Sequence, residues 1–216
     1  MITLQIDNQP VDCDHGANLL KVCLDNGIYI PNLCYIDGMT HPPASCRLCF
    51  VEIDGKAHPV PSCTVFVHGS MAVRTDTPPV RRLQKTALQL LLSVHDVDCK
   101  NCPANRQCAL QDMAGFLKAA LKSKTLDQFL KKTRVDQRHA FLDYYPNRCV
   151  LCGKCVYICR AQQNRAELTF AGRGFQTVIG FFHNPESMPP SCETCNACAE
   201  ICPVAALVPK SGKPAS

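Results

Sequence analysis

The sequence contains no tryptophan, few aromatic residues and no long apolar run. Phe, Trp and Tyr together make up 6% of the 216 residues. No stretch approaches the roughly 18 consecutive apolar residues that a membrane-spanning helix needs. The first residues lack the basic and apolar regions of a secretory signal. We therefore expect a cytoplasmic protein with no membrane span, built from small, loop-rich modules.

The glycine-rich motifs of nucleotide-binding proteins are also missing. Gly172 and Gly174 do not follow the G-x-G-x-x-G pattern, and Gly153-Lys154 has no upstream P-loop glycine. No order of Ser, His and Asp and no pair of carboxylates indicates hydrolysis or acid–base catalysis. We therefore expect no complete active site on this chain.

Cysteine, by contrast, is abundant. Seventeen of the 216 residues are cysteine, and an odd number excludes a complete disulfide framework. In a reducing compartment this density indicates metal binding. Cys13 and Cys23 have no partner at a ligand spacing, and we predict that both are packing residues. The remaining fifteen fall into four groups.

Two groups share the spacing C-x2-C-x2-C-x3-C, which is typical of bacterial ferredoxins with two [4Fe-4S] clusters. In such modules the fourth cysteine of each group binds the other cluster. The predicted ligand sets are Cys149, Cys152, Cys155 and Cys202 for one cluster, and Cys192, Cys195, Cys198 and Cys159 for the other. Structural zinc is the weaker alternative, because zinc sites usually place two C-x2-C pairs far apart. Arg160 stands where many ferredoxins have proline, and it either raises a cluster's potential or is a solvated surface residue.

Another group has a central C-x2-C pair flanked by single cysteines, as is typical of a [2Fe-2S] cluster. Its members are Cys34, Cys46, Cys49 and Cys63. The surrounding pattern predicts strands at 1–6, 50–53, 60–67 and 71–74 and a helix at 17–26 that stops at Gly27. These elements predict a small β-grasp domain, with zinc as the alternative to [2Fe-2S].

The last group combines one histidine with three cysteines: His95, Cys99, Cys102 and Cys108. A helix capped by Thr77 is predicted to precede it, with an apolar face of Leu83, Ala87, Leu90, Leu91 and Val94. If this helix continues to His95, His95 and Cys99 face one point. We predict a [4Fe-4S] cluster here, with structural zinc as the alternative. The histidines at 15, 41, 58, 68, 139 and 183 are expected to be packed or surface residues.

In this order the four groups resemble the N-terminal iron–sulfur module of the large iron–sulfur subunit of respiratory complex I. They also resemble the accessory domains of [FeFe] hydrogenases and the iron–sulfur subunits of NAD-linked hydrogenases and formate dehydrogenases. The resemblance rests on residues 45–53, 95–112, 148–155, 173–177 and 202–207.

The resemblance implies one [2Fe-2S] cluster and three [4Fe-4S] clusters. It implies that these clusters pass electrons between a flavin/NAD(P)-binding subunit and a catalytic subunit. A hydrogenase is the first candidate for the catalytic subunit, and a formate dehydrogenase or a complex I-like reductase is the runner-up. Ferredoxin is a further candidate partner, and the catalytic metal is expected on another polypeptide. The sequence alone does not show electron bifurcation.

The formal net charge of +5 does not by itself indicate a nucleic-acid partner. Bound clusters and their thiolates would add about −7, which leaves the loaded chain close to neutral. Basic residues crowd positions 118–138 without interleaved stacking aromatics, so we expect no nucleic-acid binding. A solvated helical face or a subunit contact is the expected role of this stretch.

Together these patterns predict an α+β chain. Residues 1–77 form the [2Fe-2S] β-grasp, ferredoxin-like domain, and residues 78–140 form a helical segment with the His-ligated cluster. Residues 141–209 form the two-[4Fe-4S] ferredoxin domain, with a strand pair inserted at 168–180, and residues 210–216 form a polar tail. Because each part is too small for a large core, the cluster-free chain is expected not to fold. The alternative from a different class is a zinc-binding scaffold protein.

Overall fold

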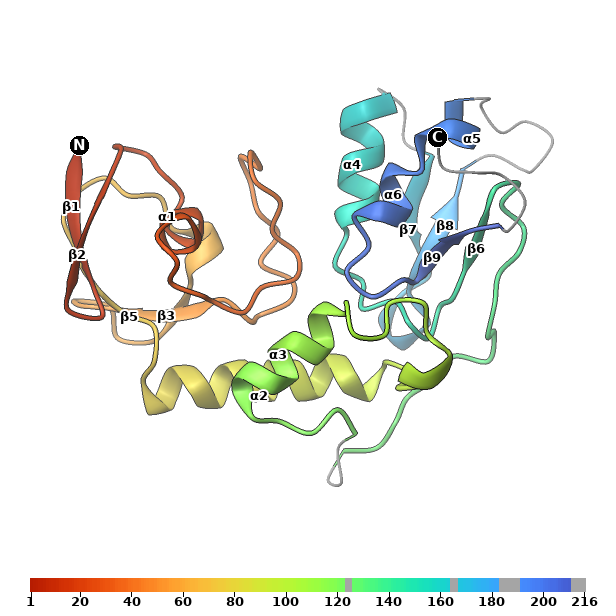
Figure 1. Ribbon diagram of the computed structural model, residues 1–216, viewed down its shortest axis with the longest axis horizontal. Coiled ribbons are helices and arrows are strands. Elements are labelled where there is room, and N and C mark those ends of the chain that lie inside the picture. Colours follow the sequence, from red (N-terminus) through yellow and green to blue (C-terminus); the bar gives the residue numbers. More distant parts are fainter. Residues whose placement is uncertain (123–125, 164–166, 183–190, 211–216) are drawn as a thin grey trace. The chain divides into compact units, whose positions relative to one another are not determined.

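The computed structural model describes residues 1–122, 126–163, 167–182 and 191–210. The chain divides into two compact units (Figure 1). Unit 1 comprises Met1–Gln89 and Met113–Ala119, and unit 2 comprises Leu90–Asp112 and Ala120–Ser216. Among the described residues, no helix is both long enough and apolar enough to cross a membrane.

The strands of unit 1 form one mixed sheet in the order β2-β1-β5-β3-β4. Their bounds are Ile2–Ile6 for β1, Gln9–Cys13 for β2, Phe50–Ile53 for β3, Val60–Pro61 for β4 and Ala72–Arg74 for β5. β1 runs parallel to β5, and the other neighbouring pairs are antiparallel. The mixed sheet and its helices agree with the predicted α+β class.

The core of unit 1 lies between this sheet and helix α1 (Leu19–Asp25), which is seen beside the strands in Figure 1. Alternate residues of β1, Leu4 and Ile6, are fully buried against Leu19. Cys23 is fully buried in the same core, as expected of a packing residue, and Cys13 is half-buried against it. Burial of these side chains stabilises the domain that contains the predicted [2Fe-2S] ligands.

The strands of unit 1 differ from the predicted ones in two places. Strand β2, the second strand of the β1–β2 hairpin, has no predicted counterpart, because Pro10 interrupts its pattern. The prediction of a strand over 60–67 is wrong beyond Pro61, because Ser62–Thr64 form a 3₁₀ turn, η1. Both the N–H and the hydroxyl of Ser62 donate to the carbonyl of Cys49 (2.8 Å each), which turns the chain there.

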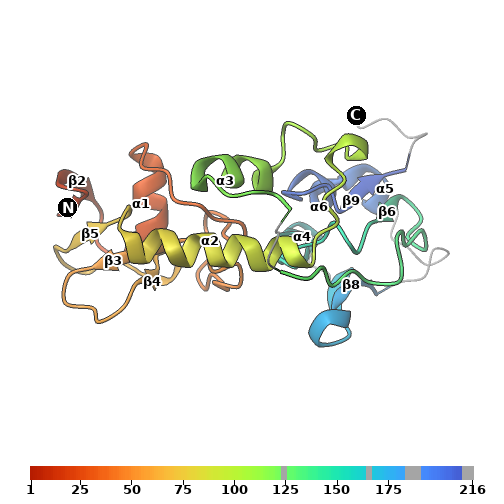
Figure 2. The same cartoon turned by 90° about the horizontal axis from the view of Figure 1, so that it is seen from below.

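Helix α2 (Pro78–Ser93), seen along its length in Figure 2, begins where expected. The hydroxyl of Thr77 accepts a hydrogen bond from the N–H of Val80 (3.4 Å), which confirms the predicted cap. The predicted apolar face is wrong at Leu90, which is 57% exposed, whereas Gln84 is buried. The side-chain nitrogen of Gln84 donates to the carbonyl of Phe50 (3.1 Å), and this bond fixes the face that α2 turns inward.

The strands described in unit 2 form two antiparallel pairs, β6 with β9 and β7 with β8. Their bounds are Leu142–Tyr144 for β6, Leu168–Ala171 for β7, Val178–Phe181 for β8 and Leu207–Pro209 for β9. The β7–β8 pair confirms the strand pair predicted at 168–180. The α-helices described within 120–216 are α4 (Lys154–Gln163), α5 (Ser191–Cys195) and α6 (Ala197–Glu200), with α4 and α6 side by side (Figure 1).

The basic stretch at 118–138 does not form a helical face. Helix α3 (Ala109–Leu117) ends just before it, and the residues described within 118–138 contain no helix. Lys118 adopts a left-handed conformation (φ 50°), and the N–H of Ala119 bonds back to the carbonyl of Ala114 (2.9 Å). These features are typical of a helix C-terminus, so the prediction of a helical face is wrong there.

Candidate iron–sulfur cluster sites

Four buried cysteines of unit 1 come together as two close pairs. The sulfur atoms of Cys34 and Cys46 lie 3.4 Å apart, and the thiols of Cys49 and Cys63 are hydrogen-bonded to each other. Two thiolates bound to one tetrahedral metal ion lie roughly 3.8 Å apart. The arrangement therefore suits two adjacent irons that each take two thiolates, as a [2Fe-2S] cluster requires.

One thiol of each pair ionises more readily than the other. The hydrogen bond with Cys46 lowers the pKa of Cys34, and the bond with Cys63 lowers the pKa of Cys49. The same hydrogen bonds, followed by burial, raise the pKa of Cys46 and Cys63. Because only thiolates bind iron, metal loading at this site would release the protons that Cys46 and Cys63 hold.

The loops between paired cysteines adopt unusual backbone conformations. Arg47, Leu151 and Asn196 each lie inside a C-x2-C pair and have φ angles of 53°, 52° and 43°. Non-glycine residues seldom take positive φ. Left-handed residues of this kind occur in backbone concavities that bind anions. The three positive φ angles therefore mark tight turns between paired cysteines, of a kind that suits a negatively charged group.

One cavity of unit 2 has about 330 Å³ of free space, part of which is open to solvent. It is lined by four of the predicted ligands: Cys149, Cys152, Cys155 and Cys202. Three belong to one motif and the fourth to the other, which is the grouping that the spacing predicts. The N–H groups of Leu151 and Ala206 donate to the sulfurs of Cys149 (3.4 Å) and Cys202 (3.2 Å), as suits thiolate acceptors.

A second cavity of unit 2 has about 400 Å³ of free space, again partly open to solvent. It is lined by the other four ferredoxin-type cysteines: Cys159, Cys192, Cys195 and Cys198. Burial raises the pKa of Cys192 to about 11 and that of Cys198 to about 12. Buried thiols of this kind are poor free nucleophiles and need a cation to stabilise their thiolates.

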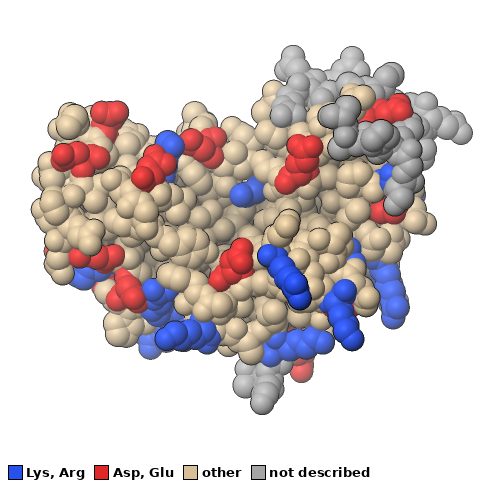
Figure 3. Space-filling view, viewed as in Figure 1, with Lys and Arg blue, Asp and Glu red and all other residues tan. Residues whose placement is uncertain are grey.

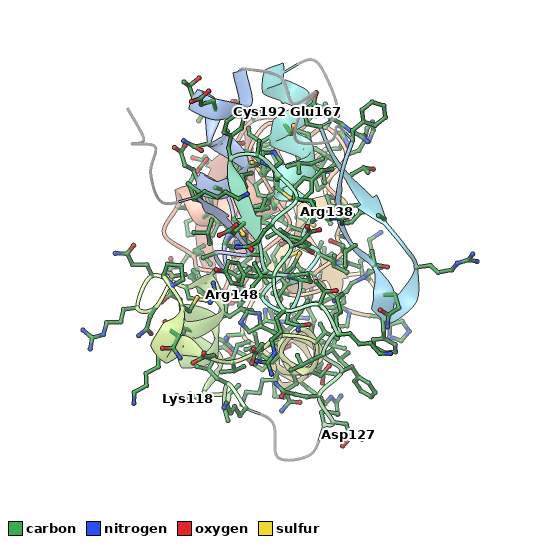
Figure 4. All side chains as sticks on the ribbon, turned by 90° about the vertical axis from the view of Figure 1, so that its right-hand side faces the viewer. Lys118, Asp127, Arg138, Arg148, Glu167 and Cys192 are labelled. Atoms are coloured by element: carbon green, nitrogen blue, oxygen red, sulfur yellow. The ribbon has the colours of Figure 1, made fainter. Side chains whose placement is uncertain are left out.

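His139 and Glu167 line the same cavity, and both are buried. Figure 4 shows Glu167 and Cys192 close together at the top of the view. His139 is packed, as expected, and burial, followed by the charge of Lys210, lowers its pKa to about 4. Glu167 was not among the predicted site residues. Neither Glu167 nor His139 stands at a metal-ligand spacing from any cysteine.

The His95 site is not built on a helix. Helix α2 ends at Ser93, and the N–H of His95 donates to the carbonyl of Leu92 in a turn (3.2 Å). Cys99 begins a separate 3₁₀ turn, η2 (Cys99–Asn101). The predicted helical alignment of His95 with Cys99 is therefore wrong, and the loop after α2 places both residues.

The imidazole of His95 is nevertheless oriented as a metal ligand would be. It is buried, and its Nδ1 lies 2.8 Å from the carbonyl oxygen of Arg148. Because a carbonyl only accepts, Nδ1 bears the hydrogen and Nε2 keeps its lone pair for a metal. Burial also lowers the pKa of His95, which favours the neutral ring that a metal requires.

The three cysteines of this site also lie near one another. Burial raises the pKa of Cys108, and the neighbouring thiols of Cys102 and Cys99 raise it further. Within the described part of the chain, no three His, Cys, Asp or Glu side chains converge on the geometry of a single metal ion. A cluster does not require such convergence, because its ligands are spread over several irons.

Two protein families match the chain. Residues 1–78 match the 2Fe-2S iron-sulfur cluster binding domain, and residues 84–119 match the NADH-ubiquinone oxidoreductase-G iron-sulfur binding region. The chain thus contains domains of the [2Fe-2S]-binding and [4Fe-4S]-binding kinds.

Curated relatives include a G-type subunit of the NADH-quinone oxidoreductase of Rhizobium meliloti (strain 1021). It is 32% identical over 211 residues, which cover 96% of this chain and 24% of that protein. NADP-reducing hydrogenase subunit HndD of Solidesulfovibrio fructosivorans is 29% identical, over 96% of this chain and 36% of that protein. The chain therefore spans about a quarter to a third of the length of these relatives.

A solved crystal structure of an NAD+-reducing [NiFe]-hydrogenase in the H2-reduced state also contains a similar chain. The TM-score is 0.84 at 28% identity, covering 100% of this chain and 90% of that one. Homologues of the chain thus include subunits of complex I and of NAD(P)-linked hydrogenases, and the chain contains two kinds of iron–sulfur-binding domain.

Proposed function

We propose that the chain is an electron-relay subunit that binds one [2Fe-2S] cluster and three [4Fe-4S] clusters. The observation that carries the proposal is the pair of cavities in unit 2, each lined by three cysteines of one motif and one of the other. Bound clusters would supply one-electron carriers. No substrate needs to bind to this chain for that role.

The proposed ligands follow the predicted groups. The [2Fe-2S] cluster takes Cys34, Cys46, Cys49 and Cys63, and the [4Fe-4S] clusters take the sets His95, Cys99, Cys102 and Cys108; Cys149, Cys152, Cys155 and Cys202; and Cys192, Cys195, Cys198 and Cys159. The domain boundaries proposed above separate these sites into three regions.

The chain's own residues bind the irons, exclude water and set the charge around each site. Buried thiolates supply anionic ligands, and N–H donors such as those of Leu151 and Ala206 stabilise negative charge on the sulfurs. At the remaining site, neutral His95 replaces a thiolate. One fewer negative charge favours the reduced form relative to a site with four cysteines.

The proposed partners are a flavin/NAD(P)-binding subunit on one side and the catalytic subunit of a hydrogenase on the other. The hydrogenase assignment is supported by the similar chain of the [NiFe]-hydrogenase structure and by the name of the Solidesulfovibrio relative. A complex I-like reductase is the second candidate, and the Rhizobium relative supports it. A pull-down that identifies the co-purifying catalytic chain distinguishes the two.

Anaerobic iron, zinc and acid-labile sulfide analysis tests the relay itself. We expect about 14 irons and about 14 sulfides per chain, with one [2Fe-2S] signal in the EPR spectrum of the reduced protein. Cys13→Ser, which changes a half-buried cysteine outside the ligand sets, is the control and should keep the full iron content. Zinc without sulfide in the purified protein would reject the proposal in favour of a zinc-binding scaffold.

A further inference from the structure

Arg148 contacts residues of two proposed cluster sites at once. Its carbonyl oxygen accepts the hydrogen bond from Nδ1 of His95 (2.8 Å). Its guanidinium donates to the carbonyl of Asn101 (3.3 Å), in the turn η2 between the first two cysteines of the His95 site. Its own peptide bond leads directly to Cys149, which lines the neighbouring cavity. One residue therefore joins the His95 site to the first site of the ferredoxin motif.

The surroundings hold Arg148 in this position. The guanidinium carbon lies 4.0 Å from the centroid of the Tyr145 ring, a cation–π contact, and the N–H of Arg148 donates to the carbonyl of Tyr145 (3.0 Å). The neighbouring carbonyl of Asn147 accepts from the N–H of Asp96 (2.6 Å). Two hydrogen bonds thus tie residues 95–96 to residues 147–148. Figure 4 labels Arg148 near the middle of the view.

This geometry gives a short connection between the two sites. One hydrogen bond and two covalent bonds separate the His95 ring from the backbone nitrogen of Cys149. The carbonyl also fixes which nitrogen of His95 faces the metal. The route passes through the main chain, so it exists whatever side chain occupies position 148.

The side chain of Arg148 adds a permanent positive charge beside the turn η2. Arg148 lines a groove of unit 2. The other charged residues of this groove are Asp96, Asp98, Lys131, Lys132 and Arg134. Figure 3 shows Lys and Arg side chains gathered along the lower right of the view. Lys132 and Arg134 are exposed, whereas Arg148 and Lys131 are half-buried. The bond from the Arg148 guanidinium to Asn101 is exposed, so water and salt screen its charge in part. A half-buried cation beside the loop favours the more negative, reduced state of a cluster bound there.

We infer that Arg148 is a positioning residue of the relay. Its main chain connects the His95 site to the Cys149 site, and its guanidinium holds the turn η2 and raises the reduction potential of the His95 cluster. The inference rests on the proposed function, because it requires clusters at both sites.

The test uses the complete complex of this chain with its partners and three variants. Arg148→Gln keeps a donor for the Asn101 carbonyl but removes the charge, and Arg148→Lys keeps the charge without the planar donor group. Arg138→Ala is the matched control, since Arg138 is 80% exposed and pairs with Asp136 at 2.6 Å. Iron and sulfide are counted first, and an EPR-monitored redox titration follows.

We expect full iron content in all three variants. At a fixed ambient potential, Arg148→Gln should lower the reduced-to-oxidised ratio of one [4Fe-4S] centre about three- to tenfold. Tenfold corresponds to about 59 mV for a one-electron couple. Arg148→Lys should stay within about twofold of the wild type, and Arg138→Ala should not shift any centre.

The outcomes separate this inference from the proposed function. Wild-type protein without clusters would reject the relay itself. Clusters in full amount, with the same potentials in Arg148→Gln and the wild type, would overturn only the role of the Arg148 guanidinium. If Arg148→Gln loses iron while Arg148→Lys keeps both iron and potential, the charge is required and the inference stands. Equal loss of iron from both would show a purely structural residue and overturn it.

Discussion

Asn18 links helix α1 to the proposed [2Fe-2S] site, and Asn18→Ala is expected to destabilise unit 1. Its side-chain oxygen accepts hydrogen bonds from the N–H groups of Leu20 (3.1 Å) and Lys21 (3.3 Å). Its side-chain nitrogen donates to the carbonyl of Cys63 (2.7 Å). Only 8% of Asn18 is exposed, so water cannot take over these bonds when the side chain is removed.

The expected cost has two parts. Loss of the helix cap costs about 1 to 2 kcal/mol. The buried carbonyl of Cys63, left without its donor, costs about 1 to 3 kcal/mol. Together they amount to about 2 to 5 kcal/mol, a large fraction of the stability of a small domain. Asn18→Asp separates the two, since a carboxylate still caps the helix but cannot donate to Cys63.

Unfolding of a cluster-loaded protein is not a reversible two-state process, so the assay is kinetic. The loss of [2Fe-2S] absorbance in guanidinium is followed with time. If the lost bonds are absent from the unfolding transition state, about 2 kcal/mol accelerates this loss about 30-fold. Asn18→Ala should reach at least that value, and Asn18→Asp should lie between it and the wild type.

A variant of the same helix supplies the control. Asp25→Asn removes the exposed ion pair between Asp25 and Lys21 (3.1 Å), which contributes less than about 1 kcal/mol. Its bleaching rate should stay within about fivefold of the wild type. If Asn18→Ala bleaches no faster than Asp25→Asn, the bond to Cys63 has no energetic role and the reasoning is refuted.

Three other predictions concern unit 2. Cys202→Ser and Cys159→Ser should each remove about 4 irons and abolish different [4Fe-4S] EPR signals, and loss of the same signal from both would contradict the crossed grouping. His95→Cys should lower the potential of one [4Fe-4S] centre, because a thiolate adds negative charge. A redox titration with no shifted centre would exclude His95 as a ligand. His139 accepts two backbone N–H bonds on Nδ1 (3.1 and 3.2 Å), and its pKa is lowered to about 4 from 6.5. The contribution of neutral His139 to the free energy of unfolding is complete above pH 6.5. It should fall by about 1.4 kcal/mol per pH unit towards pH 4, because the histidine takes up a proton in the unfolded chain before it does so in the folded chain. The rate at which [4Fe-4S] absorbance is lost in guanidinium should therefore change less in His139→Asn than in the wild type between about pH 7 and about pH 5.5, and an equal change would contradict this assignment.

The strand at 50–53, the cap by Thr77 and the strand pair at 168–180 were predicted from residue patterns within each segment. The failures depend on single side-chain bonds to another segment, which such patterns do not contain. Ser62 turns the chain through its bonds to Cys49, and Gln84 faces inward because it reaches the carbonyl of Phe50. The hydrophobic periodicity of the segments 60–67 and 78–93 does not predict these hydrogen-bond partners.

The cysteine groups could be predicted because short, regular spacings constrain a loop directly. The rest of each cavity comes from segments that a single sequence does not pair. Glu167 reaches the second cavity from the residue before β7, and His139 reaches it from before β6. The orientation of His95 depends on the carbonyl of Arg148, more than fifty residues later. Spacing therefore identified the candidate ligands but not the groups that orient them or set their charge.

The two units differ in how much they depend on their clusters. Unit 1 has a five-stranded sheet and a continuous apolar core around Leu4, Ile6 and Leu19. In the described part of unit 2 the sheets are two-stranded, and such sheets are marginal in water on their own. Its two cavities are lined by cysteines together with apolar side chains such as Leu142 and Ile179. Cluster binding should therefore supply part of the folding free energy of unit 2, because each proposed cluster joins cysteines from both ferredoxin-type motifs.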